Sequence, residues 1–155
     1  MIVTRNLLPA VNLGADKIGC IGSQVPLSGP TGMGYQYQWT FNGSPLPAGQ
    51  SINATNLGTY SLIVTDANGC TNVDMVDVDF KPGPSVTLSD VNIEICEGES
   101  YQLEATTTAT KIEWLKDGQT INGQTNKTLT ITQAGTYTIK ASGIVGGGAE
   151  CTVIS

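Results

Sequence analysis

The residues of this chain with the most reactive side chains are four cysteines, and no histidine accompanies them. Without histidine the chain lacks the commonest general base and any Cys/His zinc site. Cys20, Cys70, Cys96 and Cys151 do not form a Cys-x-x-Cys motif. Their spacing therefore favours disulfides in an oxidising compartment, which predicts an extracellular or cell-surface protein.

No other residue pattern favours catalysis. The sequence contains no Gly-x-Ser-x-Gly elbow and no Gly-rich phosphate loop, so we expect neither an enzyme nor a cofactor. A calcium ion at a junction between modules stays open as an alternative. Three carboxylates would provide its ligands: Asp16, Asp74 and Asp90.

The elements that carry the cysteines occur twice. The landmarks of the first copy are Cys20, Trp39, Tyr60 and Cys70, and those of the second are Cys96, Trp114, Tyr137 and Cys151. The offsets between matching landmarks are 76, 75, 77 and 81 residues. Such nearly constant offsets indicate a tandem duplication. Each copy has about 75 residues, a size at which one hydrophobic core is only marginally sufficient.

Alternation of side chains predicts strands in both copies. Residues 35–41 alternate aromatic with polar side chains, as a half-buried strand does. Residues 60–65 and 137–140 are further expected strands, and residues 66–69 form a turn. Short strands, one central Trp and a Gly-x-Tyr before a late strand predict an all-β fold of two tandem immunoglobulin-like β-sandwich domains.

The strand order of that fold identifies the expected core. Its residues are Leu27, Trp39, Tyr60 and Leu62 in the first copy, and Leu103, Trp114, Tyr137 and Ile139 in the second. Tyr35 and Phe41 lie nearest the ends of their strand and are the candidates for contact with a ligand such as a carbohydrate. Alternation places both on the same face as Trp39, which favours core packing.

Domain boundaries follow from one stiff segment and from the two ends. Residues 81–84 read Lys-Pro-Gly-Pro, so we expect domains over residues 10–82 and 83–155. The second copy ends soon after Cys151, which truncates its last strand. If Ser155 is joined to Met1, the sequence continues after Cys151 much as it does after Cys70. Residues 1–9 are therefore expected to complete the last strand of a neighbouring module. The apolar residues of this assembly strand are Ile2, Val3, Leu7, Val153 and Ile154.

The repeat pattern predicts disulfides within each copy, Cys20 with Cys70 and Cys96 with Cys151. The strand order opposes this pairing, because it puts the two cysteines of one copy at opposite ends of the sandwich. A disulfide needs Cα atoms within about 7 Å. Either the first strands depart from this topology, or the bonds link neighbouring modules.

Several short motifs resemble a known kind of module. They are Leu13-Gly14-x-Asp16, Cys20-x-Gly22, Tyr37-x-Trp39, Gly58-x-Tyr60 and Gly69-Cys70. This run resembles the Ig-like or PKD-like tandem repeats of large surface and gliding adhesins that Bacteroidetes export through the type IX secretion system. The second copy matches more loosely. The resemblance covers nearly the whole chain and implies a module type and a secreted setting, but no ligand.

We therefore expect a structural repeat unit of an extracellular filament or giant cell-surface adhesin, acting as a stiff spacer and assembly module. Its partners would be neighbouring copies or repeats of the same protein. A net charge of −6 argues against nucleic acid. No apolar run approaches the roughly 20 residues of a membrane span, which argues against direct membrane insertion. The alternatives are a carbohydrate- or protein-binding module of an adhesin, and a subunit that polymerises by donor-strand complementation.

Overall fold

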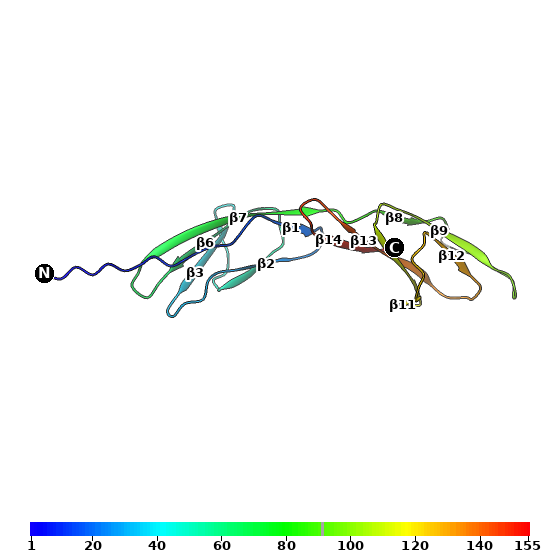
Figure 1. Ribbon diagram of the computed structural model, residues 1–155, viewed down its shortest axis with the longest axis horizontal. Helices are drawn as coiled ribbons and strands as arrows, with labels where there is room; N and C mark the ends of the chain where they lie inside the picture. Colours follow the sequence, from blue (N-terminus) through cyan, green and yellow to red (C-terminus); the bar gives the residue numbers. More distant parts are fainter. Residues whose placement is uncertain (91) are drawn as a thin grey trace. The chain divides into compact units, whose positions relative to one another are not determined.

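The computed structural model describes residues 1–90 and 92–155, and every regular element among them is a β-strand. The chain divides into two compact parts, Met1–Lys81 and Pro82–Ser155, which we call unit 1 and unit 2. Both are immunoglobulin-like β-sandwiches, and the fold is all-β (Figure 1). Within the described ranges, no helix is long and apolar enough to span a membrane.

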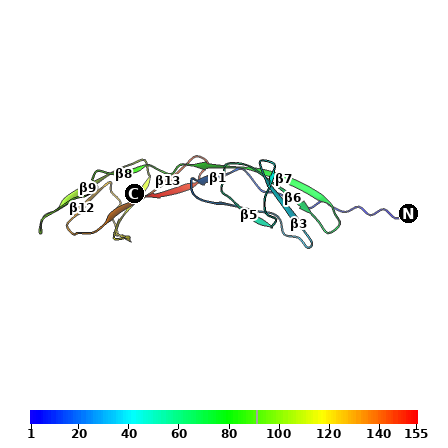
Figure 2. The same ribbon diagram turned by 180° about the vertical axis from the view of Figure 1, so that it is seen from behind.

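Unit 1 is built from a large sheet and a strand pair. Its strands are β1 (Lys17–Cys20), β2 (Val25–Ser28), β3 (Gln36–Phe41), β4 (Ser44–Pro45), β5 (Ser51–Ala54), β6 (Gly58–Thr65) and β7 (Thr71–Lys81). The large sheet has the order β1-β7-β6-β3-β4, and β2 pairs with β5. β3, β6 and β7 lie side by side in both views (Figures 1 and 2). β1 is parallel to the end of β7, and the other pairs of this unit are antiparallel.

Unit 2 follows a similar plan but differs at its first and last strands. Its strands are β8 (Val86–Leu88), β9 (Tyr101–Thr107), β10 (Lys111–Lys116), β11 (Gln119–Thr120), β12 (Thr128–Ile131), β13 (Tyr137–Ile144) and β14 (Glu150–Ile154). One sheet has the order β11-β10-β13-β14 and the other β12-β9-β8. β14 has 5 residues, whereas the equivalent β7 has 11. This difference matters for the site described below.

Strand alternation creates the two cores. β6 buries every second side chain, and so does β13. The buried cluster of unit 1 contains Leu27, Trp39, Tyr60 and Leu62, and that of unit 2 contains Leu103, Trp114 and Ile139. Tyr137 is only half-buried and packs against the second cluster.

Each core is centred on one tryptophan. Trp39 and Trp114 are both completely buried. Their indole N–H groups donate to backbone oxygens, Trp39 to Gly49 at 2.9 Å and Trp114 to Asn126 at 2.8 Å. A buried indole needs such an acceptor because its N–H would otherwise lose a hydrogen bond to water.

A tyrosine corner lies at the start of β6 and of β13. The Tyr60 hydroxyl donates to the carbonyl of Asn56 at 3.1 Å, and the Tyr137 hydroxyl donates to the carbonyl of Gln133 at 3.0 Å. A tyrosine that returns to the backbone a few residues upstream is a hallmark of immunoglobulin sandwiches. The two copies therefore share this detail as well as the strand order.

Matching hairpin turns follow β3 and β10. Asn42 and Asp117 have positive φ values of 45° and 51°, and each precedes a glycine. Two consecutive residues with positive φ form the type I′ hairpin turn that suits the twist of antiparallel strands. Each turn side chain also accepts a backbone N–H, Asn42 from Thr59 at 3.0 Å and Asp117 from Thr136 at 2.8 Å.

Candidate assembly site

The last strand of unit 1 is held on both sides. Residues 75–78 of β7 pair with residues 58–61 of β6, and residues 78–81 pair with β1. The side chains of Val76 and Val78 are 1% and 2% exposed. This half of β7 therefore closes both the sheet and the core of unit 1.

The equivalent position in unit 2 is open. β14 pairs with β13 only over residues 140–144. Residues 135–138 correspond to residues 58–61, and in the described part of unit 2 no strand pairs with them on the β14 side. Residues 93–96 correspond to β1 and belong to no strand. Two backbone segments of unit 2 therefore lack the partner that their counterparts have in unit 1.

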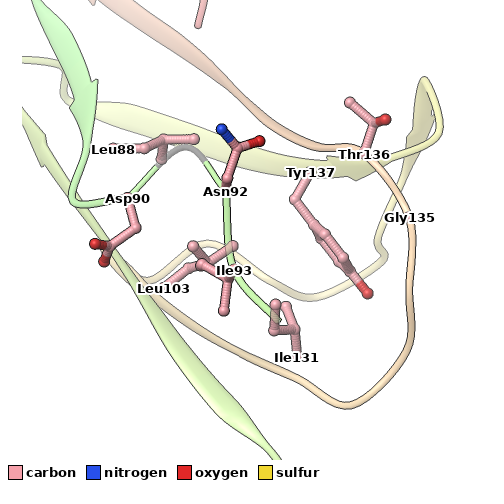
Figure 3. A pocket seen from close by; sticks show the side chains of 9 residues that line it. All are labelled: Leu88, Asp90, Asn92, Ile93, Leu103, Ile131, Gly135, Thr136 and Tyr137. Atoms are coloured by element: carbon pink, nitrogen blue, oxygen red, sulfur yellow. The ribbon is translucent and has the colours of Figure 1, made fainter. Parts of the chain in front are cut away.

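A groove lies between these two segments. It consists of two adjoining hollows of about 290 Å³ and 460 Å³, which share Ile93, Ile131, Gly135 and Tyr137. Figure 3 shows Asn92 and Ile93 on one segment and residues 135–137 on the facing one. Leu103 and Ile131 provide further apolar lining. The groove combines apolar side chains, set among polar ones such as Asn92 and Thr136, with two backbone edges, as an acceptor for a β-strand does.

The rim of this groove is acidic. Asp90 lines the first hollow and Glu94 the second. Tyr101 donates its hydroxyl to the Asp90 carboxylate at 2.6 Å. This hydrogen bond, together with one from Ser89, lowers the pKa of Asp90 below its usual value, and the same contact raises the pKa of Tyr101. Asp90 is therefore a carboxylate at neutral pH, which favours a strand that carries a positive charge.

The segment predicted to act as an assembly strand is exposed. Residues 1–9 have no regular secondary structure, and Ile2, Val3 and Leu7 are 95%, 82% and 85% exposed. On β14, Val153 is half-buried and Ile154 is 60% exposed. Unit 1 holds the end of the segment, where the Asn72 side chain donates to the carbonyl of Pro9 at 2.9 Å. Several large apolar side chains are thus left without a core.

The predicted disulfides within each repeat are wrong. Cys70 and Cys96 are free thiols, whereas Cys20 and Cys151 are disulfide-bonded. Cys20 lies opposite Lys81 at the end of β7, and Cys70 immediately precedes the first residue of that strand. An 11-residue strand at about 3.3 Å per residue separates its ends by more than 30 Å. A bond between these two cysteines is therefore excluded by the strand order.

The aromatic candidates for ligand contact pack against the core. Tyr35 and Phe41 are both half-buried against the cluster of unit 1. The ring of Tyr35 meets Tyr37 edge-on with centroids 6.4 Å apart, and Phe41 lies 4.9 Å from Tyr60. Both rings border the core instead of forming an exposed sugar-binding platform.

The three carboxylates considered as calcium ligands each accept a hydrogen bond from a different protein group. Asp16 accepts the amide of Asp77 at 3.1 Å, and Asp74 accepts the amide of Leu13 at 2.7 Å. Asp90 belongs to unit 2 and accepts from Tyr101. Over residues 1–90 and 92–155, no group of three or more His, Cys, Asp or Glu side chains is arranged to hold a metal ion.

Sequence reasoning predicted an assembly strand but did not predict one side of the groove. Residues 93–96, with Ile93 and Ile95, were not among the predicted site residues. The 76-residue offset that relates Cys20 to Cys96 also relates β1 to these residues. That offset was the available signal for the second edge.

No family model matches the chain, and no curated protein matches it. Among solved structures, the chain is similar to titin domains Z1Z2 in complex with telethonin, with 18% identity over 97% of this chain and 95% of that chain and a TM-score of 0.44. It is also similar to Sidekick-1 immunoglobulin domains 1–4, with 15% identity over 95% of this chain and 47% of that chain and a TM-score of 0.40. A third similarity is to the three N-terminal domains of the bacteriophage RB49 outer capsid protein Hoc, with 16% identity over 89% of this chain and 55% of that chain and a TM-score of 0.39.

Proposed function

We propose that this chain is a structural repeat unit of an extracellular filament or giant cell-surface adhesin, in which residues 1–8 of one copy fill the groove in unit 2 of its neighbour. The observation that carries the proposal is that β7 fills the same position in unit 1. The neighbour is either the adjoining repeat of one longer polypeptide or a separate copy, because both present the same residues to the groove. The resemblance to Bacteroidetes surface repeats supports the setting at the cell surface.

The sequence of residues 1–8 supports one register. If Met1 follows Ser155 of the neighbour in the strand, Ile2 takes the position of Val76 and Thr4 that of Val78. Ile2 then enters the groove, where burial of such a side chain contributes about 1.5–3 kcal/mol. Val3 takes the position of Asp77 and faces outward. Its amide meets Asn92, as the Asp77 amide meets Asp16 in unit 1.

Side-chain sizes agree with this register. In unit 1 a Cβ atom on Gly19 would come within 2.8 Å of the Phe80 ring, so the small residue leaves room for the large one. In unit 2 the position of Gly19 is taken by Ile95, and that of Phe80 falls to Asn6 of the inserted strand. The larger side chain has thus changed places with the smaller one, which preserves the packed volume.

Charge also agrees. In unit 1 Asp79 lies opposite Ile18 across the parallel pair of β1 and β7. The corresponding pair in the filled groove is Arg5 opposite Glu94, and Asp90 adds a second negative charge to the rim. The basic residue of the strand therefore meets the acidic rim.

Strand exchange of this kind suits a spacer. Each unit has about 75 residues and a core of marginal size. A strand that crosses from one copy into the next adds apolar burial to the second copy and restricts bending between the two. The function that follows is mechanical: a series of sandwiches that stabilise one another along the array.

Sedimentation velocity of the full chain in reducing buffer tests this proposal. We expect association that grows with concentration, because residues 1–8 of one molecule enter unit 2 of another. Ile2→Asp should abolish it, since the charge would enter an apolar groove. Val3→Asn is the control: it is polar but uncharged, so it does not repel the acidic rim, and it should leave association intact. A chain that stays monomeric, or one whose association survives both Ile2→Asp and deletion of residues 1–8, would overturn the proposal.

A further inference from the structure

The four cysteines fall into two kinds of position. Cys20 and Cys96 occupy the first cysteine position of their units, and Cys70 and Cys151 the last. One cysteine of each kind is disulfide-bonded, namely Cys20 and Cys151. One cysteine of each kind is a free thiol, namely Cys70 and Cys96. The bonded cysteines and the free ones therefore each include one cysteine of either kind.

The two bonded cysteines lie beside the residues that link the units. Cys20 pairs in register with Lys81, the last residue of unit 1. Cys151 lies in unit 2 beside Gly83, where a Cβ atom would be 3.6 Å from its own Cβ. Lys81 and Gly83 are separated by one residue. Within its own unit, each bonded cysteine thus lies beside the end of that unit's chain that is nearest the boundary.

The two free cysteines flank the corresponding point between copies. In the register proposed above, Leu7 of the inserted strand takes the position of Lys81, which brings it opposite Cys96 of the accepting copy. Pro9 follows two residues later and takes the position of Gly83. Pro9 accepts a hydrogen bond from Asn72 of its own copy at 2.9 Å, and Asn72 is two residues from Cys70. Both cysteines therefore lie near one short stretch of chain in this register.

We infer that Cys96 of each copy forms a disulfide with Cys70 of the copy whose residues 1–8 fill its groove. The inference rests on the proposed function, because the inserted strand brings the two thiols together. Cys96 is exposed and Cys70 half-buried, so both can be reached by an oxidant. The bond would fix the inserted strand at its far end and make the array covalent even between separate copies.

Oxidised glutathione, as a small-molecule disulfide, supplies the oxidant for this step. The Cys96 thiolate attacks one glutathione sulfur, which forms a mixed disulfide and releases one glutathione thiolate. The Cys70 thiolate then attacks the Cys96 sulfur and releases the second glutathione. Two protein thiols have then lost two protons and two electrons, and one glutathione disulfide has become two thiols.

A tandem of two full copies, with Ser155 of the first joined to Met1 of the second, tests the inference. After equilibration in a glutathione redox buffer, free thiols are alkylated and the disulfides mapped by mass spectrometry. We expect a peptide pair that joins Cys96 of the first copy to Cys70 of the second. Only Cys70 of the first copy and Cys96 of the second should be alkylated. Cys96→Ser in the first copy alone should make Cys70 of the second copy reactive.

Alkylation of both Cys70 and both Cys96 residues would overturn the inference, and so would a bond between any other pair of these thiols. Amide hydrogen exchange of the same tandem in reducing buffer separates this outcome from failure of the proposed function. If residues 1–8 of the second copy were protected but the disulfide did not form, the inserted strand would be supported and the cross-link contradicted. If the tandem showed neither the disulfide nor protection of residues 1–8, the cross-link and the inserted strand would both be contradicted.

Discussion

Tyr60 and Val76 lie directly opposite each other on β6 and β7, and their side chains are 3% and 1% exposed. Tyr137 takes the place of Tyr60 in unit 2. It pairs with Lys116 of β10 on one side, and in the part of unit 2 that the structure describes no strand pairs with it on the other. Val76 thus covers Tyr60 in the core of unit 1, whereas no strand residue covers Tyr137 in the described part of unit 2.

Substitution of Val76 measures the contribution of a filled position. Val76→Ala should lower the free energy of unfolding of unit 1 by about 2 kcal/mol, because it leaves a cavity in a packed core. Val73→Ala on the same strand is the matched control, since Val73 is 53% exposed. It should change stability by less than about 0.5 kcal/mol. Urea titrations followed by amide signals of unit 1 make the comparison, and equal effects of the two variants would show that β7 does not close this core.

The tyrosine corner predicts a smaller loss. Tyr60→Phe removes a hydroxyl that both donates to the Asn56 carbonyl and accepts its amide. We expect unit 1 to lose about 1 kcal/mol, the usual net contribution of a hydrogen bond. Tyr137→Phe should act similarly on unit 2 by removing the bond to Gln133. Thermal unfolding of each variant gives the values, and an unchanged stability would mean that water replaces the hydroxyl at no cost.

Asp117 makes unit 2 sensitive to acid. The amide of Thr136 and then Lys116 hold the pKa of Asp117 below its usual value of 3.8. The folded state therefore favours the carboxylate, and this stabilisation is present above the unfolded pKa and lost as pH falls through the folded one. Asp117→Asn should reduce the loss of stability as the pH falls below 3.8, since an amide oxygen can still accept the Thr136 amide as Asn42 accepts that of Thr59.

The measurement for Asp117 is the urea midpoint of unit 2 at several pH values, for the native chain and for Asp117→Asn. Asp90 also has a lowered pKa and is present in both proteins, so only the difference between the two curves is informative. Parallel curves would contradict the role assigned to Asp117.

Much of the fold could be predicted because local pattern and core packing agree. Alternation around Trp39 and the Gly-x-Tyr motif before Leu62 carry enough information to identify a sandwich. The disulfides could not be predicted, since cysteine pairing depends on which strand ends meet in space. Residues 93–96 were missed for a different reason: the apolar alternation of Ile93 and Ile95 is short, and the strand that would pair with it belongs to a neighbouring copy in our proposal.

The most direct test of the central claim uses the tandem of two copies in reducing buffer, with isotope labelling of one copy at a time. In this molecule the groove of the first copy can receive residues 1–8 of the second. We predict that the amides of Ile93, Ile95, Gly135 and Tyr137 exchange slowly in the first copy and fast in the second, and that Ile2→Asp in the second copy removes the difference. The amide of Thr136 donates to Asp117 within each copy and should exchange alike in both. Equal exchange in the two copies of the unsubstituted tandem would contradict the claim that residues 1–8 complete the sandwich of a neighbour.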